Sequence, residues 1–258
     1  MLARCVLVKH AYEIIAEGDN YEVLHDTTKC VCSGRTDVFN EHSTYCLRVK
    51  AVNKKISQDY VMAKIDELAY LPISDGQIDL RNPSHELHLI ELYETSSTHQ
   101  QTSADLGYVY FARWIGPGQT SLADRYNIKK RCYIGNTTLD PRLALIQANL
   151  ANVGPGSLVL DPFVGTGGIL LAAAHFGGLC VGTEINYSVA HGIGRSSRVS
   201  QRYLTDRETI AANFDQYGLS NRLLSIVIAD SSRSGLWRSN LRFDAIVCDR
   251  ECGCFLGM

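Results

Sequence analysis

The sequence contains no run of about 20 apolar residues, the length that a membrane-spanning helix needs. It also lacks an excess of charge of either sign, because 25 Lys and Arg residues against 27 Asp and Glu residues give a formal net charge of -2. A balanced chain has no global attraction to a polyanion, so any contact with nucleic acid must be local. No membrane partner is expected.

The nine cysteines form no regular framework, and no secretory signal opens the chain. This pattern favours a reducing, cytoplasmic compartment over a disulfide-stabilised secreted fold. Two close pairs, Cys30 with Cys32 and Cys252 with Cys254, are too tightly spaced for the usual zinc knuckle and have no His-x3-His partner. No metal site is therefore predicted.

Residues 157–168 predict a buried strand, a tight glycine turn and the start of a helix. The apolar run Leu158–Leu160 is typical of a strand that is covered on both faces of a parallel sheet. Gly165 and Gly167 let the backbone turn sharply and approach a ligand at a helix N-terminus. On its own, a Gly-x-Gly-Gly turn serves plain strand-to-helix packing about as often as ligand binding.

Four strand-like runs each stop at an acidic residue, and these residues are Asp161, Glu184, Asp230 and Asp249. Because helical patterns separate the first three runs, right-handed crossovers place the strands in one parallel sheet, with the acids at its carboxyl edge. Ligands of open α/β sheets bind at that edge. One acid there is more often a helix cap or a solvated loop residue, but four in register indicate a binding site.

The carboxylate of Asp161 discriminates between two kinds of cofactor. It would repel the pyrophosphate of a dinucleotide at close range, whereas a cationic ligand would be attracted. S-adenosylmethionine carries a sulfonium and an ammonium group and has no phosphate. Glu184 suits its ribose diol, because two hydroxyls can donate to one carboxylate, and Asp230 suits its adenine amine.

The segment Asp161–Gly168, with Ala174–Gly177 and Gly182–Tyr187 downstream, closely resembles the motifs of eukaryotic tRNA guanosine-10 N2-methyltransferases. The resemblance extends from about Ala3 to Asp249. It implies an N-terminal region with a THUMP domain, an RNA-binding α/β module, followed by a seven-stranded, Rossmann-like S-adenosylmethionine methyltransferase domain. It also implies tRNA as substrate, a small zinc-binding activator subunit as partner, and Phe163 beside the cofactor.

The expected organisation is α/β throughout. Residues 1–94 form the partial THUMP-like region, residues 95–135 a linker with an aromatic strand, and residues 136–258 a methyltransferase domain that holds the first four strands and is truncated at its C-terminal end. Within the first region, residues 18–43 are polar and are predicted to be loop. Strands are predicted at 45–51 and 87–93, and a helix at 61–71 follows the Ser57 cap.

Several cations are candidates for RNA contact. Lys129, Lys130 and Arg131 form the densest basic cluster in the chain, beside two tyrosines, a mixture that single-stranded RNA recognition often uses. A solvated turn is an equally good interpretation. Arg113 either touches RNA or ties the linker to the catalytic domain. Another group, Arg48, Lys50, Lys54 and Lys55, is more readily explained as an ordinary solvated face.

The resemblance implies that Asp249 is the catalytic acid, because the family carries Asp-Pro-Pro-Tyr at the end of the fourth strand. There the acid accepts a hydrogen bond from the guanine amine, and an aromatic ring stacks on the base. In this sequence Arg250-Glu251-Cys252 follows Asp249 instead. We therefore expect the chain as written to be inactive although its family is catalytic.

Three hypotheses remain. The first is a tRNA N2-guanine methyltransferase, here represented by an incomplete chain. The second is a non-catalytic module that binds tRNA or the cofactor. The third is a nucleotide-binding Rossmann domain, which Asp161 disfavours.

Overall fold

The computed structural model describes residues 2–74, 77–94, 105–135, 138–192 and 208–249. Its contacts divide the chain into two compact units. The N-terminal unit comprises residues 10–117, and the C-terminal unit comprises residues 3–9 and 118–258. Both units combine a sheet with helices, so the predicted α/β class is confirmed.

The N-terminal unit contains one four-stranded sheet in the order β1-β4-β3-β2. Its strands are β1 (His10–Gly18), β2 (Tyr45–Val52), β3 (His85–Tyr93) and β4 (Leu106–Pro117). β4 pairs antiparallel with β1 and β3, whereas β2 and β3 are parallel. The strands predicted at 45–51 and 87–93 therefore lie side by side in register.

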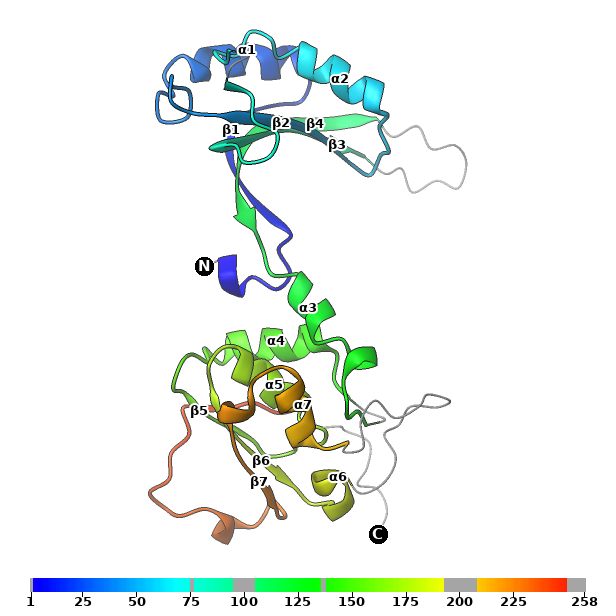
Figure 1. Ribbon diagram of the computed structural model, residues 1–258, viewed down its shortest axis with the longest axis vertical. Coiled ribbons are helices and arrows are strands. Elements are labelled where there is room, and N and C mark those ends of the chain that lie inside the picture. Colours follow the sequence, from blue (N-terminus) through cyan, green and yellow to red (C-terminus); the bar gives the residue numbers. More distant parts are fainter. Residues whose placement is uncertain (1, 75–76, 95–104, 136–137, 193–207, 250–258) are drawn as a thin grey trace. The chain divides into compact units, whose positions relative to one another are not determined.

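Two helices, α1 (Tyr21–Cys32) and α2 (Gln58–Asp66), lie on the same face of this sheet (Figure 1). Leu24 of α1 packs there with Leu87 of β3 and Phe111 of β4, and all three side chains are fully buried. Ser57 caps α2 as predicted, because its hydroxyl accepts the Tyr60 N–H at 3.2 Å.

The prediction of loop for residues 18–43 is wrong, because α1 occupies much of this segment. The polar composition of this segment suggested that Asn20 is a turn residue. Asn20 is instead the N-cap of α1, and its side chain accepts the Val23 N–H at 2.9 Å. The buried stripe of α1 consists of Leu24, Thr28 and Cys32. Only one of these three is a strongly apolar residue, so the helical period was hidden.

The structure also divides the segment 95–135 that was expected to hold a linker and an aromatic strand. The aromatic strand is β4, an inner strand of the first sheet. Val109 and Phe111 are fully buried in the core of the N-terminal unit. The boundary between the two units therefore falls at Pro117–Gly118.

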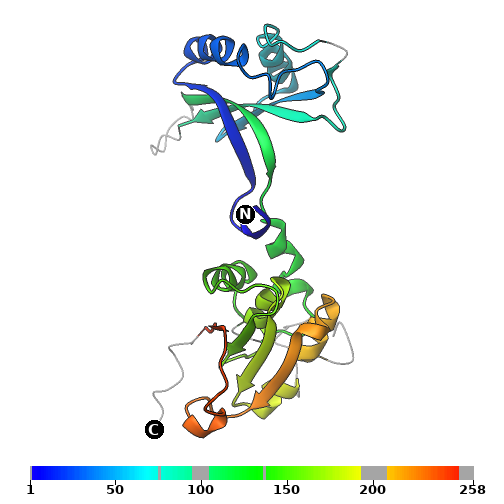
Figure 2. The same ribbon diagram turned by 90° about the vertical axis from the view of Figure 1, so that its left-hand side faces the viewer.

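The C-terminal unit contains a parallel sheet in the order β7-β6-β5-β8. Its strands are β5 (Leu158–Asp161), β6 (Leu179–Glu184), β7 (Leu223–Ile228) and β8 (Ala245–Ile246). Numbered along the chain, the order is 3-2-1-4, which is half of a doubly wound sheet. Figure 2 shows β5, β6 and β7 running side by side.

The helices of this unit are α3 (Ser121–Arg125), α4 (Pro141–Leu150), α5 (Gly168–His175), α6 (Tyr187–His191) and α7 (Ile210–Gln216), with short 3-10 turns at Leu2–Arg4, Ile128–Lys130, Ser220–Arg222 and Ser234–Leu236. α5 is buried over nearly its whole length and packs with Leu145 of α4 and Phe214 of α7 in the core. In the part of the chain that is described, no helix is both long and apolar enough to cross a membrane.

The short segment Ala3–Lys9 is built into the C-terminal unit. Val6 is buried in its core, and Arg4 lies over the ring of Phe176 at 4.2 Å from the centroid. The Arg4 Nε–H donates to Asn149 Oδ1 at 2.9 Å, and Asn149 Nδ2 donates back to the Arg4 carbonyl at 2.7 Å. These contacts join residues that are 145 positions apart in sequence.

Arg4→Ala should destabilise the C-terminal unit by about 1–2 kcal/mol, because it removes one side-chain hydrogen bond and the cation–π contact. Each unit holds one of the two tryptophans, Trp114 and Trp237, so urea unfolding of single-tryptophan variants reports on each unit separately. Lys9→Ala in the same segment is the matched control. A loss of stability reported by Trp114 and not by Trp237 would contradict this assignment.

Candidate functional site

The parallel sheet of the C-terminal unit carries the acidic residues at its carboxyl edge. Asp161 is the last residue of β5 and Glu184 is the last residue of β6. Asp230 and Asp249 follow β7 and β8. β5 and β8 are the neighbours between which the strand order reverses, which is where ligands of open α/β sheets bind.

Asp161 is buried, with only 1% of its surface exposed. One carboxylate oxygen accepts the Phe163 N–H at 3.0 Å. The pKa of Asp161 is raised to about 7, mainly by burial and to a smaller extent by the nearby carboxylates of Glu184 and Asp249, while the Phe163 N–H acts in the opposite direction. Asp161, Glu184 and Asp249 are therefore close enough to interact electrostatically, and a cation among them would relieve their repulsion.

The glycine turn after Asp161 needs glycine at two positions for different reasons. Gly165 and Gly167 both have positive φ, +51° and +81°. A Cβ on Gly167 would also lie 2.8 Å from the Ile210 side chain, so this glycine permits close packing with α7. No atom of the described residues lies within 4 Å of a Cβ placed on Gly165, so that part of the chain leaves its surface open. In the same turn, the ring of Phe163 is half exposed.

Glu184 connects the glycine turn to the next helix. Its Oε2 accepts the Gly165 N–H at 3.0 Å, and its Oε1 accepts the Asn186 N–H at 2.9 Å. Both oxygens keep a further lone pair. Glu184 thus holds the turn in place and still has acceptor capacity for hydroxyl groups.

Two hydroxyl residues that the sequence reasoning missed connect the strand ends beside these acids. Thr183 Oγ1 donates to the Pro162 carbonyl at 2.7 Å, and Ser231 Oγ lies 2.7 Å from Thr183 Oγ1. These bonds link the segments that follow β5 and β7 to the end of β6. The available signal was small: a hydroxyl residue stands next to the acid in both Thr183-Glu184 and Asp230-Ser231.

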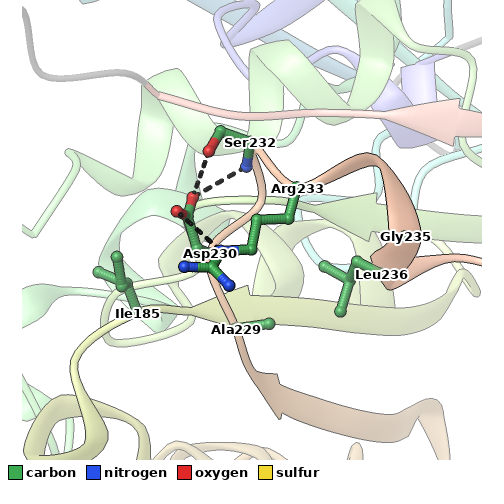
Figure 3. Close-up of a pocket in the computed structure, with 7 residues that line it drawn as sticks. All are labelled: Ile185, Ala229, Asp230, Ser232, Arg233, Gly235 and Leu236. Carbon is green, nitrogen blue, oxygen red and sulfur yellow. Dashed lines mark hydrogen bonds and ion pairs between the residues drawn. The ribbon is translucent and has the colours of Figure 1, made fainter.

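Asp230 lines an open pocket after β7. Its Oδ1 accepts the Ser232 N–H at 3.0 Å and the Ser232 hydroxyl at 2.7 Å, and these bonds hold its pKa below the usual range. Figure 3 shows Ile185 and Leu236 on either side of Asp230 and its ion-pair partner Arg233. The pocket is completed by Ala229, Ser232 and Gly235. Apolar walls with a carboxylate between them suit a flat heterocycle that carries an amino group.

The predicted RNA-binding cations do not share one surface. Lys129 and Lys130 are exposed, but Arg131 is 1% exposed and is the largest fully buried side chain in the described part of the chain. Its Nε–H donates to the Tyr126 carbonyl at 3.2 Å, and burial lowers its pKa. Its Nη1 reaches the space left by the missing side chain of Gly168. Arg131 is therefore a packing residue of the C-terminal unit and is not available to phosphate.

Arg113 lies in the N-terminal unit, where its Nε–H donates to Glu13 Oε2 at 2.8 Å. Glu13 also accepts from Arg35 Nη2 at 2.7 Å. Arg113 therefore joins β4 to β1 within one sheet and does not tie a linker to the catalytic domain, which corrects that expectation. The contact with Glu13 occupies the guanidinium that was expected to reach RNA.

The carboxylate and hydroxyl groups at this sheet edge fit a ligand with a cationic end, hydroxyl groups and no phosphate. Acidic and hydroxyl oxygens surround the edge, and the closely spaced carboxylates of Asp161 and Glu184 would repel a phosphate. Among the described residues, no group of three His, Cys, Asp or Glu side chains could hold a metal ion. Arg250, Glu251 and Cys252, where the Pro-Pro-Tyr of the family was expected, lie outside the described residues.

Comparison with family models matches each half of the chain separately. Residues 1–120 match the Tmrp11 THUMP N-terminal domain, and residues 129–249 match the RMKL-like methyltransferase domain. The predicted resemblance is therefore confirmed for both halves.

Comparison with curated proteins finds tRNA (guanine(10)-N(2))-methyltransferases. The chain is 37% identical over 254 residues to TRMT11 of Bos taurus, which covers 98% of this chain and 54% of that protein. It is 31% identical over 252 residues to the enzyme of Schizosaccharomyces pombe, covering 98% and 49%. The chain thus spans about half the length of the curated relatives that it matches. Among solved structures, TrmN from Thermus thermophilus is 16% identical with a TM-score of 0.39, covering 87% of this chain and 58% of that one.

Asp161→Asn should stabilise the ligand-free protein at pH 8 but hardly at pH 4. Burial raises the folded-state pKa from its usual 3.8 to about 7, so the wild type loses stability as the pH rises through this interval, by at most roughly 4 kcal/mol. The asparagine cannot ionise and avoids this loss. Thermal melts of both proteins from pH 4 to pH 8 measure the difference, with Asp26→Asn on α1 as the control. A difference that does not change with pH would show that Asp161 titrates normally.

Proposed function

We propose that the protein methylates tRNA, because residues 1–120 match the Tmrp11 THUMP N-terminal domain and residues 129–249 match the RMKL-like methyltransferase domain. The reaction is transfer of a methyl group from S-adenosylmethionine to the exocyclic N2 of a guanine, the reaction named for its relatives. The protein acts in the cytoplasm, with tRNA as its partner and a small zinc-binding subunit as its activator.

One observation supports this proposal most strongly. The buried carboxyl of Asp161 lies at the end of an inner strand, and the glycine turn that follows is held by Glu184. A nucleotide cofactor would bring its phosphates to this turn, against two carboxylates. A sulfonium cofactor brings positive charge to the same place.

Different residues of the sheet edge contact different parts of the cofactor. Asp161 in its ionised form attracts the ammonium end, and the bare surface of Gly165 leaves room for the chain beside it. Glu184 accepts from the ribose diol, Phe163 covers the ligand from the turn, and Asp230 accepts from the adenine amine between Ile185 and Leu236. When bound, S-adenosylmethionine supplies an electrophilic methyl group.

Asp249 orients the nucleophile. It is exposed after β8, and its charge contributes to the raised pKa of Asp161, so it lies near the cofactor edge. A carboxylate there accepts a hydrogen bond from the guanine amine and holds it in the direction of attack. Correct orientation of two reacting groups lowers the barrier by several kcal/mol, about 7–11 kcal/mol in favourable cases.

The remaining RNA contacts are divided between the units. The N-terminal unit, matched to a THUMP domain, binds the tRNA, and exposed Lys129 and Lys130 add local positive charge in the C-terminal unit. Since Arg131 is buried, the phosphate contact at this cluster is made by the two lysines alone.

A second candidate function is a non-catalytic module that binds tRNA or the cofactor. The sequence Arg250-Glu251-Cys252 after Asp249 favours it, because it supplies no aromatic ring to stack on the base. A guanidinium next to Asp249 would also compete for the acceptor that the guanine amine needs. We propose that the chain as written holds the cofactor half of the site without completing the site for the base.

Glu184→Ala should weaken S-adenosylmethionine binding by roughly 1.5–3 kcal/mol, the range for hydrogen bonds to charged groups. Loss of the Gly165 contact adds to this effect, whereas Glu184→Gln keeps one acceptor oxygen and should lose less. Calorimetry against S-adenosylmethionine and NAD measures both ligands, with Glu22→Ala on α1 as the control. Tighter binding of NAD, or unchanged affinity in both Glu184→Ala and Asp161→Ala, would refute the cofactor assignment.

The 258-residue chain should transfer no methyl group, while a chain with Pro-Pro-Tyr after Asp249 and the remaining length of its relatives should do so. The assay is transfer from labelled S-adenosylmethionine to unmodified tRNA, with the activator subunit present. In the extended protein, Asp249→Ala should lower kcat far more than it changes the affinity for the cofactor. Robust turnover by the 258-residue chain would show that the catalytic residues lie elsewhere.

A further inference from the structure

The first sheet has one face that no helix of the N-terminal unit covers within the described residues. α1 and α2 both lie over the opposite face (Figure 1), where Leu24 of α1 packs in one core with Val109 and Phe111 of β4. Because side chains alternate along a strand, Tyr108 and Tyr110 project from the uncovered face. We call this surface the open face; its polar and aromatic side chains are Tyr12, Arg48, Lys50, Tyr108, Tyr110 and Trp114.

The open face carries aromatic rings along its two neighbouring strands β1 and β4. Tyr12 and Trp114 are directly opposed across the β1–β4 pair. Tyr108 and Tyr110 follow on β4 with their ring centroids 5.0 Å apart. All four side chains are partly exposed. Partly exposed rings on a sheet surface offer flat apolar area at which another π-system can stack.

Cations on β2 lie on the same face. The Lys50 Nζ donates to the Tyr12 hydroxyl at 3.1 Å, which brings the charge to the rim of the aromatic row. Arg48 is about half exposed, and its Nε–H donates to Glu86 Oε1 at 2.7 Å. The same Glu86 oxygen lies 2.7 Å from Nε2 of buried His88, so this acid is engaged within the sheet. Glu17, opposite Tyr110 on β1, adds a further acid to this face.

We propose that the open face binds single-stranded RNA. Unstacked bases stack on the rings of Tyr108, Tyr110 and Trp114, and the backbone phosphates pair with Lys50 and Arg48. Aromatic rings beside cations on a sheet are what single-stranded RNA needs, whereas a duplex conceals its base faces. The inference rests on the proposed function for RNA as the substrate class, and it adds which surface of the N-terminal unit receives an unpaired segment.

The arrangement also explains why the sequence alone favoured a solvated surface for Arg48 and Lys50. Along β2 these cations alternate with apolar residues, as on any half-buried strand. Only the pairing of β4 between β1 and β3 shows that a row of tyrosines faces the same way. Arg48 and Lys50 therefore gain a candidate role only beside the tyrosines of β4 on the same face.

The test uses the full chain without cofactor. A ten-nucleotide single-stranded RNA of mixed sequence, labelled with fluorescein, should bind at least about tenfold tighter than the same strand annealed to its complement. Trp237→Phe leaves Trp114 as the only tryptophan, and its fluorescence should be quenched by the single strand. Tyr110→Ala and Tyr108→Ala should each weaken binding by about tenfold, while Tyr110→Phe, which keeps the ring, should bind as the wild type does.

Lys50→Ala should reduce the salt dependence of binding, because fewer counterions are released, whereas Lys29→Ala on α1 should leave it unchanged. Equal binding of duplex and single strand, an unchanged Trp114 signal, or wild-type affinity of Tyr110→Ala in a protein with a normal melting temperature would overturn the inference. Light scattering tests the alternative that this face binds a second copy of the chain. A dimer that is lost in Tyr110→Ala would overturn the inference and make the open face a dimer interface. The RNA-binding assay contains no cofactor. Failure to bind S-adenosylmethionine would therefore refute the proposed function without changing the outcome of this assay.

Discussion

The C-terminal unit depends on the burial of one carboxyl group at the end of an inner strand. Among the described residues, Asp161 has one hydrogen-bond donor, the Phe163 N–H, and two further carboxylates near it. Such a group is costly to ionise in the ligand-free protein. The turn that follows, its two glycines with positive φ and the contact of Glu184 with Gly165 are arranged around it. At this edge, ionisation of Asp161 is therefore unfavourable without a ligand, and the ionised carboxylates strongly attract a cation.

The sequence predicted the C-terminal sheet well because parallel strands that are covered on both faces appear as continuous apolar runs. Leu158–Asp161 and Leu179–Glu184 are strands with nearly the predicted limits, and each ends at its acid. The contact between Thr183 and Ser231 could not be predicted in this way. It depends on which strand ends are neighbours in space, and a hydroxyl residue beside an acid is common in any loop.

The errors in the prediction arose where composition and environment disagree. Helix α1 was missed because its buried stripe contains Thr28 and Cys32, and its cap Asn20 is also a typical turn residue. Arg131 was grouped with two exposed lysines because the three are adjacent, but the space beside Gly168 admits its guanidinium into the core. The positions of residues along the sequence do not show that a glycine far along the chain leaves space for this side chain.

The segment Ala3–Lys9 has a consequence for the order of folding during synthesis. These residues leave the ribosome long before Asn149 and Phe176, their partners, are made. The N-terminal unit can complete its sheet in the interval, and the pairing of His10 with Pro117 then brings Lys9 beside Gly118. Folding of the N-terminal unit thereby closes the long loop between residues 3–9 and residues 118–258 before these two parts of the C-terminal unit meet. Much of the entropic cost of closing that loop therefore falls on the folding of the N-terminal unit.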